Sequence, residues 1–250
     1  MQPSYILPTG VDPDLSDIKT VLVVVAHPDD IDFGCAGTVA KLTSQGINVS
    51  YCLVTSGDAG GDKDESSREQ RVDKRESEQK SAAAKVAVDK IHFLRQPDGT
   101  VESNLLLREK LTRVIRKEKP DLVITQSPNR RYDRIYASHP DHLATGEATI
   151  CACYPDCQNP HAYPNLLDEG CDPHIVKAMW IMVDESPDVF VDITDVFDQK
   201  MEALLEHKSQ IEDGEAVKEM MREWALTQAE LAGYQTPKLA ESFRFVQIAP

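Results

Sequence analysis

Two short clusters of acids and histidines carry the chemistry that this sequence could perform. The first, Ala-His-Pro-Asp-Asp at residues 26–30, directly follows an apolar run typical of a strand buried on both faces. Open α/β sheets bind ligands at the carboxyl ends of such strands. His27 and Asp30 are three residues apart, so one turn puts both side chains on the same side. They could be two of the three protein ligands of a metal ion. The alternative is a capped turn, in which Asp29 or Asp30 begins a helix.

The second cluster, His-Pro-Asp-His at residues 139–142, also follows a buried apolar run, after a polar loop. Because parallel strands end at the same edge of a sheet, we expect this cluster to rise beside the first. Together the clusters offer His27, Asp30 and one histidine of the second cluster. Two imidazoles and one carboxylate with an open position are typical of a hydrolytic zinc site.

The remaining polar residues of the two clusters suit catalysis. Asp29 is left beside the metal as a base for the attacking water. The other histidine of the second cluster can donate to the oxyanion or the leaving amine, and Asp141 can accept from an imidazole N–H and fix its tautomer. A metal- or ligand-binding domain without turnover is the alternative, but it would need no base. A nucleotide-dependent oxidoreductase of the same fold type is disfavoured because no G-x-G-x-x-G follows the first strand.

The elements that must position these clusters alternate along the chain. The expected strands are 21–26, 48–55, 90–94, 121–125, 175–183 and 189–193; the expected helices are 33–45, 66–88, 104–119, one from the second cluster to about 153, 195–210 and 215–233. This alternation predicts an α/β fold with a parallel sheet flanked by helices. Residues 1–19 are expected to form a loose arm and residues 154–174 an irregular excursion, rich in Pro, Asn and Asp.

Composition narrows the class of protein. The 250 residues suit one large α/β domain or two small ones. A net charge of −15 argues against nucleic acid and anionic membranes as partners and is compatible with a small-molecule substrate. No apolar run is long enough to span a membrane, and no secretion signal is evident, so we expect a cytoplasmic protein with reduced thiols.

A second zinc site is a weaker possibility in the cysteine-rich part of the chain. Its candidate ligands are Cys151, Cys153, Cys157, Cys171 and His174. Their spacing does not follow the C-x-x-C pattern of structural zinc sites, and Cys151 and Cys153 are expected on a helix. The preferred interpretation is therefore that these cysteines are small buried side chains.

The sequence resembles the PIG-L/LmbE-type de-N-acetylase family over nearly the whole chain after residue 20. The resemblance is carried by AHPDD at 26–30, Arg75-x-x-Glu78 on an Ala-rich helix, Pro-Asp-Gly at 97–99, HPDH at 139–142, PDVFVDITD at 187–195 and His207-x-Ser-Gln210. It implies a single LmbE-like domain over 1–250, with a three-layer, Rossmann-like α/β fold. It also implies a zinc-dependent hydrolase that removes the N-acetyl group from an N-acetylglucosamine-containing small molecule.

The resemblance also implies a role for each residue of the two clusters. The metal ligands are His27, Asp30 and His142, which would hold one zinc per chain, although iron or cobalt could take the same place. The general base is Asp29, and His139 acts as the acid or oxyanion partner.

Three further expectations come from the same resemblance. Asp141 is the orienting neighbour of His139. Arg75 contacts the substrate at the rim of the cleft, although a solvated helix face is its alternative. Because several family members are homo-oligomers, some of them hexamers, we expect residues 154–174 and the C-terminal helices to form subunit contacts.

The sequence departs from the family pattern near the second cluster. Tyr-Ala-Ser precedes HPDH, and the loop at 130–134 contains three arginines. Both departures lie where substrate specificity is expected to be set. The sequence therefore does not identify the group that is attached to the sugar. The alternative to a deacetylase is an amidase that acts on a different amide of a sugar conjugate.

Overall fold

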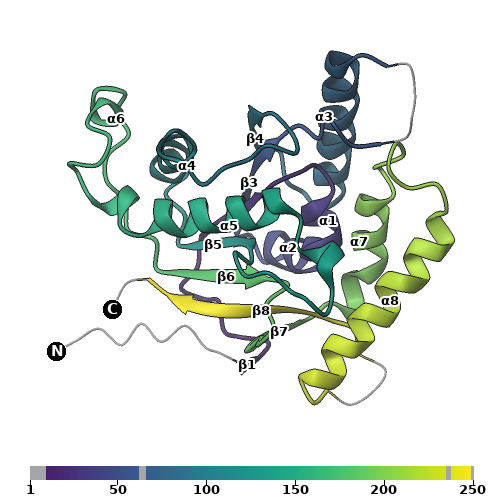
Figure 1. The fold of residues 1–250 in the computed structure, drawn as a ribbon. Helices are drawn as coiled ribbons and strands as arrows, with labels where there is room; N and C mark the ends of the chain where they lie inside the picture. Colours follow the sequence, from purple (N-terminus) through teal and green to yellow (C-terminus); the bar gives the residue numbers. More distant parts are fainter. Residues whose placement is uncertain (1–9, 62–65, 235–237, 249–250) are drawn as a thin grey trace.

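The structure is a computed structural model, and it describes residues 10–61, 66–234 and 238–248. An eight-stranded sheet runs through it in the order β1-β7-β8-β6-β5-β2-β3-β4 (Figure 1). The strands are β1 Gly10–Val11, β2 Thr20–Val25, β3 Asn48–Thr55, β4 Lys90–Gln96, β5 Leu122–Gln126, β6 Ala178–Met182, β7 Val189–Asp192 and β8 Ala240–Gln247. β8 is antiparallel to β6 and β7, and the other pairs are parallel.

Helices cover both faces of the sheet, which confirms the three-layer α/β fold. One face carries α1 Asp30–Gly34, α2 Ala36–Ser44, α3 Arg68–Lys85, α7 Phe197–Leu204 and α8 Gly214–Leu231, and the other carries α4 Leu105–Glu118 and α5 Pro140–Cys153 (Figure 1). The short helix α6, Asn165–Asp168, lies in the excursion that follows α5. None of the helices in the described part of the chain is long and apolar enough to cross a membrane.

Strand β2 is buried on both faces, as its apolar run predicts. Val21, Val23 and Val25 belong to one hydrophobic core, whereas Leu22 and Val24 belong to the core on the opposite face. From β2 the chain builds β3 and β4 to one side and then returns to place β5 and β6 on the other. The sheet therefore has its topological switch point between β2 and β5, where α/β folds bind their ligands. Both polar clusters follow these two strands.

Several elements differ from the sequence-based expectation. The helix expected over 33–45 is two helices, because the backbone breaks from helical geometry at Cys35, with φ of −151°. The expected loose arm contributes β1, which pairs with β7, while residues 1–9 lie outside the described residues. The C-terminal strand β8 was not predicted, because its residues stand in no βαβ unit and enter the sheet antiparallel.

The excursion at residues 154–174 is fixed to its own chain by Arg116 of α4. This side chain is fully buried, and its guanidinium donates to the backbone carbonyls of Asp156, Cys157, Asn159, Ala162 and Cys171. These carbonyl oxygens replace the water that the buried cation gives up. Among the described residues, which include all six cysteines, no cysteine belongs to a group close enough to share a metal. The second zinc site is therefore not supported.

Candidate active site

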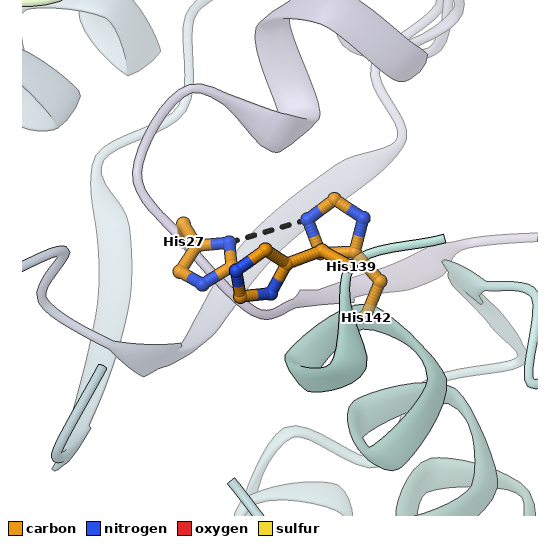
Figure 2. Close-up of side chains that lie close together, drawn as sticks. All are labelled: His27, His139 and His142. Carbon is orange, nitrogen blue, oxygen red and sulfur yellow. Dashed lines mark hydrogen bonds between the residues drawn. The ribbon is translucent and has the colours of Figure 1, made fainter. Parts of the chain in front are cut away.

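The two polar clusters meet at the switch point, where the three expected metal ligands converge. His27 Nδ1 lies 3.2 Å from His142 Nε2 and 3.3 Å from an Asp30 carboxylate oxygen. His142 Nε2 lies 3.0 Å from the other oxygen of Asp30. Figure 2 shows a dashed line that joins a ring nitrogen of His27 to one of His142, with the His139 ring beside them. Tetrahedral zinc, with ligands at about 2.0–2.1 Å, holds neighbouring ligand atoms about 3.3 Å apart, so this donor set fits a metal.

Local sequence explains how each ligand is aimed. The backbone N–H of His27 donates to the Asp30 carboxylate at 2.7 Å, which closes the turn after β2. At the second cluster, Pro140 begins α5, a position that suits proline because its missing N–H has no helical partner there. His142 follows within the first turn of α5. His139 is the N-cap residue, and its Nδ1 accepts from the N–H of Asp141 at 3.2 Å.

Carboxylates hold the far side of the His27 ring. Its Nε2 lies 3.1 Å from Asp98 and 3.3 Å from Asp141. A carboxylate can only accept, so Nε2 carries the proton and Nδ1 offers its lone pair, the arrangement found in carboxylate–histidine–metal sites. Asp141 is expected beside His139, and its backbone N–H does contact that ring, at 3.2 Å. Its carboxylate contacts His27, because the N–H groups of Gly99 (2.7 Å) and Val101 (3.2 Å) hold it there.

Asp98 is a site residue that sequence reasoning missed. It stands in the Pro-Asp-Gly turn directly after β4, which is a third strand end at the same edge of the sheet. Its carboxylate also accepts from the N–H of Ala59 at 3.1 Å. A polar residue at this third strand end was the signal that could have identified it.

The charges of the site favour a cation. Burial alone would lower the pKa of His27 and of His142, but neighbouring carboxylates, Asp30 above all, raise both. Burial would raise the pKa of Asp30, yet the two imidazoles hold it well below its usual range. Burial also opposes ionisation of Asp98, but its contact with His27 lowers its pKa to about 2. A surplus of carboxylates around two histidines is the electrostatic setting of a divalent metal site.

Asp29 occupies the N-cap position of α1 without acting as a cap. Its backbone is left-handed, with φ of 93°, and among the described residues its side chain caps no N–H of that helix. The carboxylate instead accepts from Arg75 Nη2 at 2.9 Å. Burial raises the pKa of Asp29 to about 6, against the lowering effect of Arg75. The capped-turn alternative therefore does not describe this carboxylate.

Arg75 lies inside the protein and not at the rim of the cleft. It is 5% exposed, so the solvated-face alternative is wrong. Besides Asp29, the guanidinium donates to the carbonyls of Pro28 (2.5 Å) and Gly57 (3.5 Å). A side chain at Gly57 would place its Cβ 2.6 Å from Arg75 Nη1, at a position where φ is +64°. The expected contact of Arg75 with substrate stays a prediction.

A pocket of about 470 Å³ opens beside the ligands, within the size range of small-molecule sites. Asp30 and His142 form part of its lining. The rest includes the apolar side chains Phe33, Met182, Val183, Met220, Met221 and Trp224. Arg131 and Arg134 of the basic loop also line the pocket, and Arg131 is paired with Asp133 at 2.6 Å.

The fold and the site together define an α/β protein with a candidate metal centre at the switch point of its sheet. Comparison with known proteins identifies the family to which this chain belongs. The family model of PIG-L, GlcNAc-PI de-N-acetylase, matches residues 22–153. The diacetylchitobiose deacetylase of Thermococcus kodakarensis is 34% identical over 237 residues, which cover 92% of this chain and 84% of the relative. The chain therefore belongs to the PIG-L/LmbE family of de-N-acetylases, as the sequence resemblance implied.

Two further relatives agree with this assignment. A probable N-acetyl-alpha-D-glucosaminyl L-malate deacetylase 2 of Bacillus cereus is 32% identical over 201 residues, which cover 78% of this chain and 84% of the relative. Among solved structures, the N,N'-diacetylchitobiose deacetylase of Pyrococcus horikoshii superposes with a TM-score of 0.85. It is 32% identical, with 93% of this chain and 85% of that chain covered.

Proposed function

We propose that this protein is a metal-dependent deacetylase that removes the N-acetyl group from an N-acetylglucosamine-containing small molecule. The products are acetate and a free amine. The observation that carries the proposal is the meeting of His27, Asp30 and His142 beside an acid, Asp29, that caps no helix. Family membership supports the same chemistry.

His27, Asp30 and His142 would hold the metal. Two nitrogens and one carboxylate suit zinc, and iron or cobalt fits the same set. When bound, the metal supplies Lewis acidity, which lowers the pKa of water and stabilises negative charge on an amide oxygen. We expect one metal per chain.

The chain's own residues account for the movement of protons. Asp29 takes a proton from the attacking water as the new C–O bond forms. The C–N bond then breaks, and this proton passes to the leaving nitrogen. In the neutral His139 ring, Nδ1 accepts from the Asp141 N–H, so Nε2 carries the proton that can be donated to the developing oxyanion.

For the substrate, we propose a sugar conjugate whose second part is a neutral ring. The apolar wall of the pocket, with Trp224 in it, suits the face of a sugar better than a dicarboxylate. A malate conjugate is the second candidate, favoured by Arg134 in the basic loop.

The test is acetate release from N-acetylglucosamine, its disaccharide, and its malate and inositol conjugates, with purified metal-loaded protein. We expect the disaccharide to give the highest kcat/KM. Faster turnover of the malate conjugate than of the disaccharide would show that the pocket binds a substrate carboxylate. Binding without acetate release from any of the four would favour a binding domain or an amidase for another amide.

We propose further that the protein is a single domain over residues 1–250 and works in the cytoplasm as a homo-oligomer. The six cysteines are unbonded. Free thiols are usual in the reducing cytoplasm. The family resemblance supports the oligomer.

A further inference from the structure

The backbone of Asp29 is held by a side chain that belongs to neither polar cluster. The Asp29 N–H donates to Oε1 of Gln79, on α3, at 3.0 Å. This N–H belongs to a residue with φ of 93°, a left-handed conformation that non-glycine residues seldom adopt. Such a conformation persists only where surrounding contacts impose it, and the Gln79 amide is one of those contacts.

The orientation of the Gln79 amide is itself fixed by Asp32 and His207. Its Nε2 donates to an Asp32 carboxylate oxygen at 3.0 Å, and His207 Nε2 donates to the same oxygen at 2.7 Å. Because a carboxylate only accepts, the NH2 end of the Gln79 amide must face Asp32. The carbonyl end must then face the Asp29 N–H.

The three residues behind Asp29 form a buried polar bracket: Gln79, Asp32 and His207, each 0% exposed. The bracket joins α3, α1 and the turn after α7. Asp32 Oδ1 and His207 Nδ1 have no hydrogen-bond partner within the described chain. Buried polar groups that are incompletely paired cost stability, and apolar side chains would pack there at less cost. This cost is understandable if the bracket serves Asp29.

We infer that Gln79 is a positioning residue for Asp29, and that Asp32 and His207 set the orientation of its amide. The inference rests on the proposed role of Asp29 as the general base. Arg75 holds the carboxylate of Asp29 at 2.9 Å while Gln79 holds its backbone, so the acid is restrained at both ends. Restraint of this kind keeps a base in line with the water that it must deprotonate.

The test compares Gln79→Met, which keeps the length of the side chain but loses the amide, with the wild type and with Gln228→Met. Gln228 is a matched control, a buried glutamine of α8 that accepts one side-chain hydrogen bond, from Ser242 at 2.7 Å. We expect Gln79→Met to lower kcat roughly 10- to 100-fold, with KM and metal content unchanged. The control should keep the wild-type kcat.

Asp32→Leu provides a second variant, because leucine is close to aspartate in size but offers no acceptor. Gln79 Nε2 then loses its partner, so nothing fixes which end of the Gln79 amide faces the Asp29 N–H. We expect this nearly isosteric change to lower kcat to the same extent, whereas a purely packing role predicts little effect. An unchanged kcat in both variants, or a loss of kcat matched by loss of bound metal, would overturn the inference.

Crystal structures of the wild type and Gln79→Met give a readout that does not depend on turnover. We expect the φ of Asp29 to leave the left-handed region in the variant. If Asp29 stays in place, Gln79 does not position it, whatever the activity. A wild type that releases no acetate would overturn the proposed function, while the backbone of Asp29 would still decide the structural part of the inference.

Discussion

At the scale of single residues, two adjacent acids have different surroundings. Asp30 lies between two imidazoles, 3.3 Å from His27 and 3.0 Å from His142. The Asp29 carboxylate instead accepts from the buried guanidinium of Arg75 at 2.9 Å. The backbone at Asp29 is left-handed, with φ of 93°. One acid can therefore bind a metal while its neighbour handles a proton.

Asp29→Asn should retain metal while kcat falls by roughly 10² to 10⁴, the usual contribution of a positioned acid–base group. KM should change much less, because the lost interaction belongs mainly to the transition state. Steady-state kinetics with elemental analysis of the same samples would check both. Normal turnover with metal bound would mean that another residue is the base, with His139 as the next candidate.

Asp30→Ala should lose metal and activity together, because it removes one of three ligands. Elemental analysis should find close to one divalent metal per wild-type chain and far less in the variant. Asp195→Ala, at an exposed acid in the turn before α7, should keep its metal. A metal-free protein with full activity would rule out the mechanism.

At the scale of elements, a buried ion pair joins β8 to the helical layer beside the site. The Glu241 carboxylate accepts from the N–H groups of Gly37 (3.1 Å) and Thr38 (2.7 Å) in the first turn of α2. It is paired with Lys200 of α7 at 2.6 Å, and both side chains are at most 2% exposed. The unpredicted strand β8 thus caps a helix of the site-bearing layer.

Lys200→Met should lower the free energy of unfolding by about 3–5 kcal/mol, because it leaves the Glu241 carboxylate buried without its cation. Urea denaturation would measure the loss. Lys218→Met is the matched control: its ammonium pairs at the surface with Asp198 at 3.3 Å, and its removal should cost less than about 1 kcal/mol. Equal effects of the two changes would contradict the role given to the buried pair.

The pH dependence of stability can be tested at Asp121, which joins the starts of β2 and β5. Burial would raise its pKa, but hydrogen bonds from Lys177 and the N–H groups of Lys19 and Thr20 hold it below 3.8. A pKa lowered by folding stabilises the protein above the unfolded value, and this contribution is lost as the pH falls through the folded value. Asp121→Asn should therefore cost about 1–2 kcal/mol at pH 7.

The same substitution should cost progressively less as the pH falls below 3.8, the ordinary value for Asp121. Urea denaturation of both proteins at neutral and acid pH would check this. A stability difference that stays constant across that range would show that ionisation of Asp121 does not stabilise the fold.

At the scale of the whole molecule, exposed apolar side chains lie in the segments expected to form subunit contacts. They include Tyr154 and Leu167 in the excursion and Leu231 on α8, which are 39–64% exposed. A large apolar side chain that is exposed in one chain is favourably buried against a second copy. We expect a homo-oligomer, with a hexamer as one form, by light scattering at micromolar concentration. A strictly monomeric mass would contradict this expectation.

The sequence by itself determined what depends on neighbours along the chain. Five apolar residues followed by His27-Pro-Asp-Asp30 sufficed to predict β2 and two ligands, because burial pattern and turn chemistry are local. The alternation of strands and helices sufficed to predict the α/β class and to bring His142 to the same sheet edge. Family resemblance assigned roles to these residues.

Only the tertiary structure decided the contacts between residues far apart in the chain. It placed Asp98 and Asp141 on one nitrogen of His27, Arg75 and Gln79 on Asp29, and β8 between two strands of the sheet. The contact that each of these partners makes depends on strand order and helix packing. Such contacts form only when the whole core excludes water, so no short stretch of sequence specifies them.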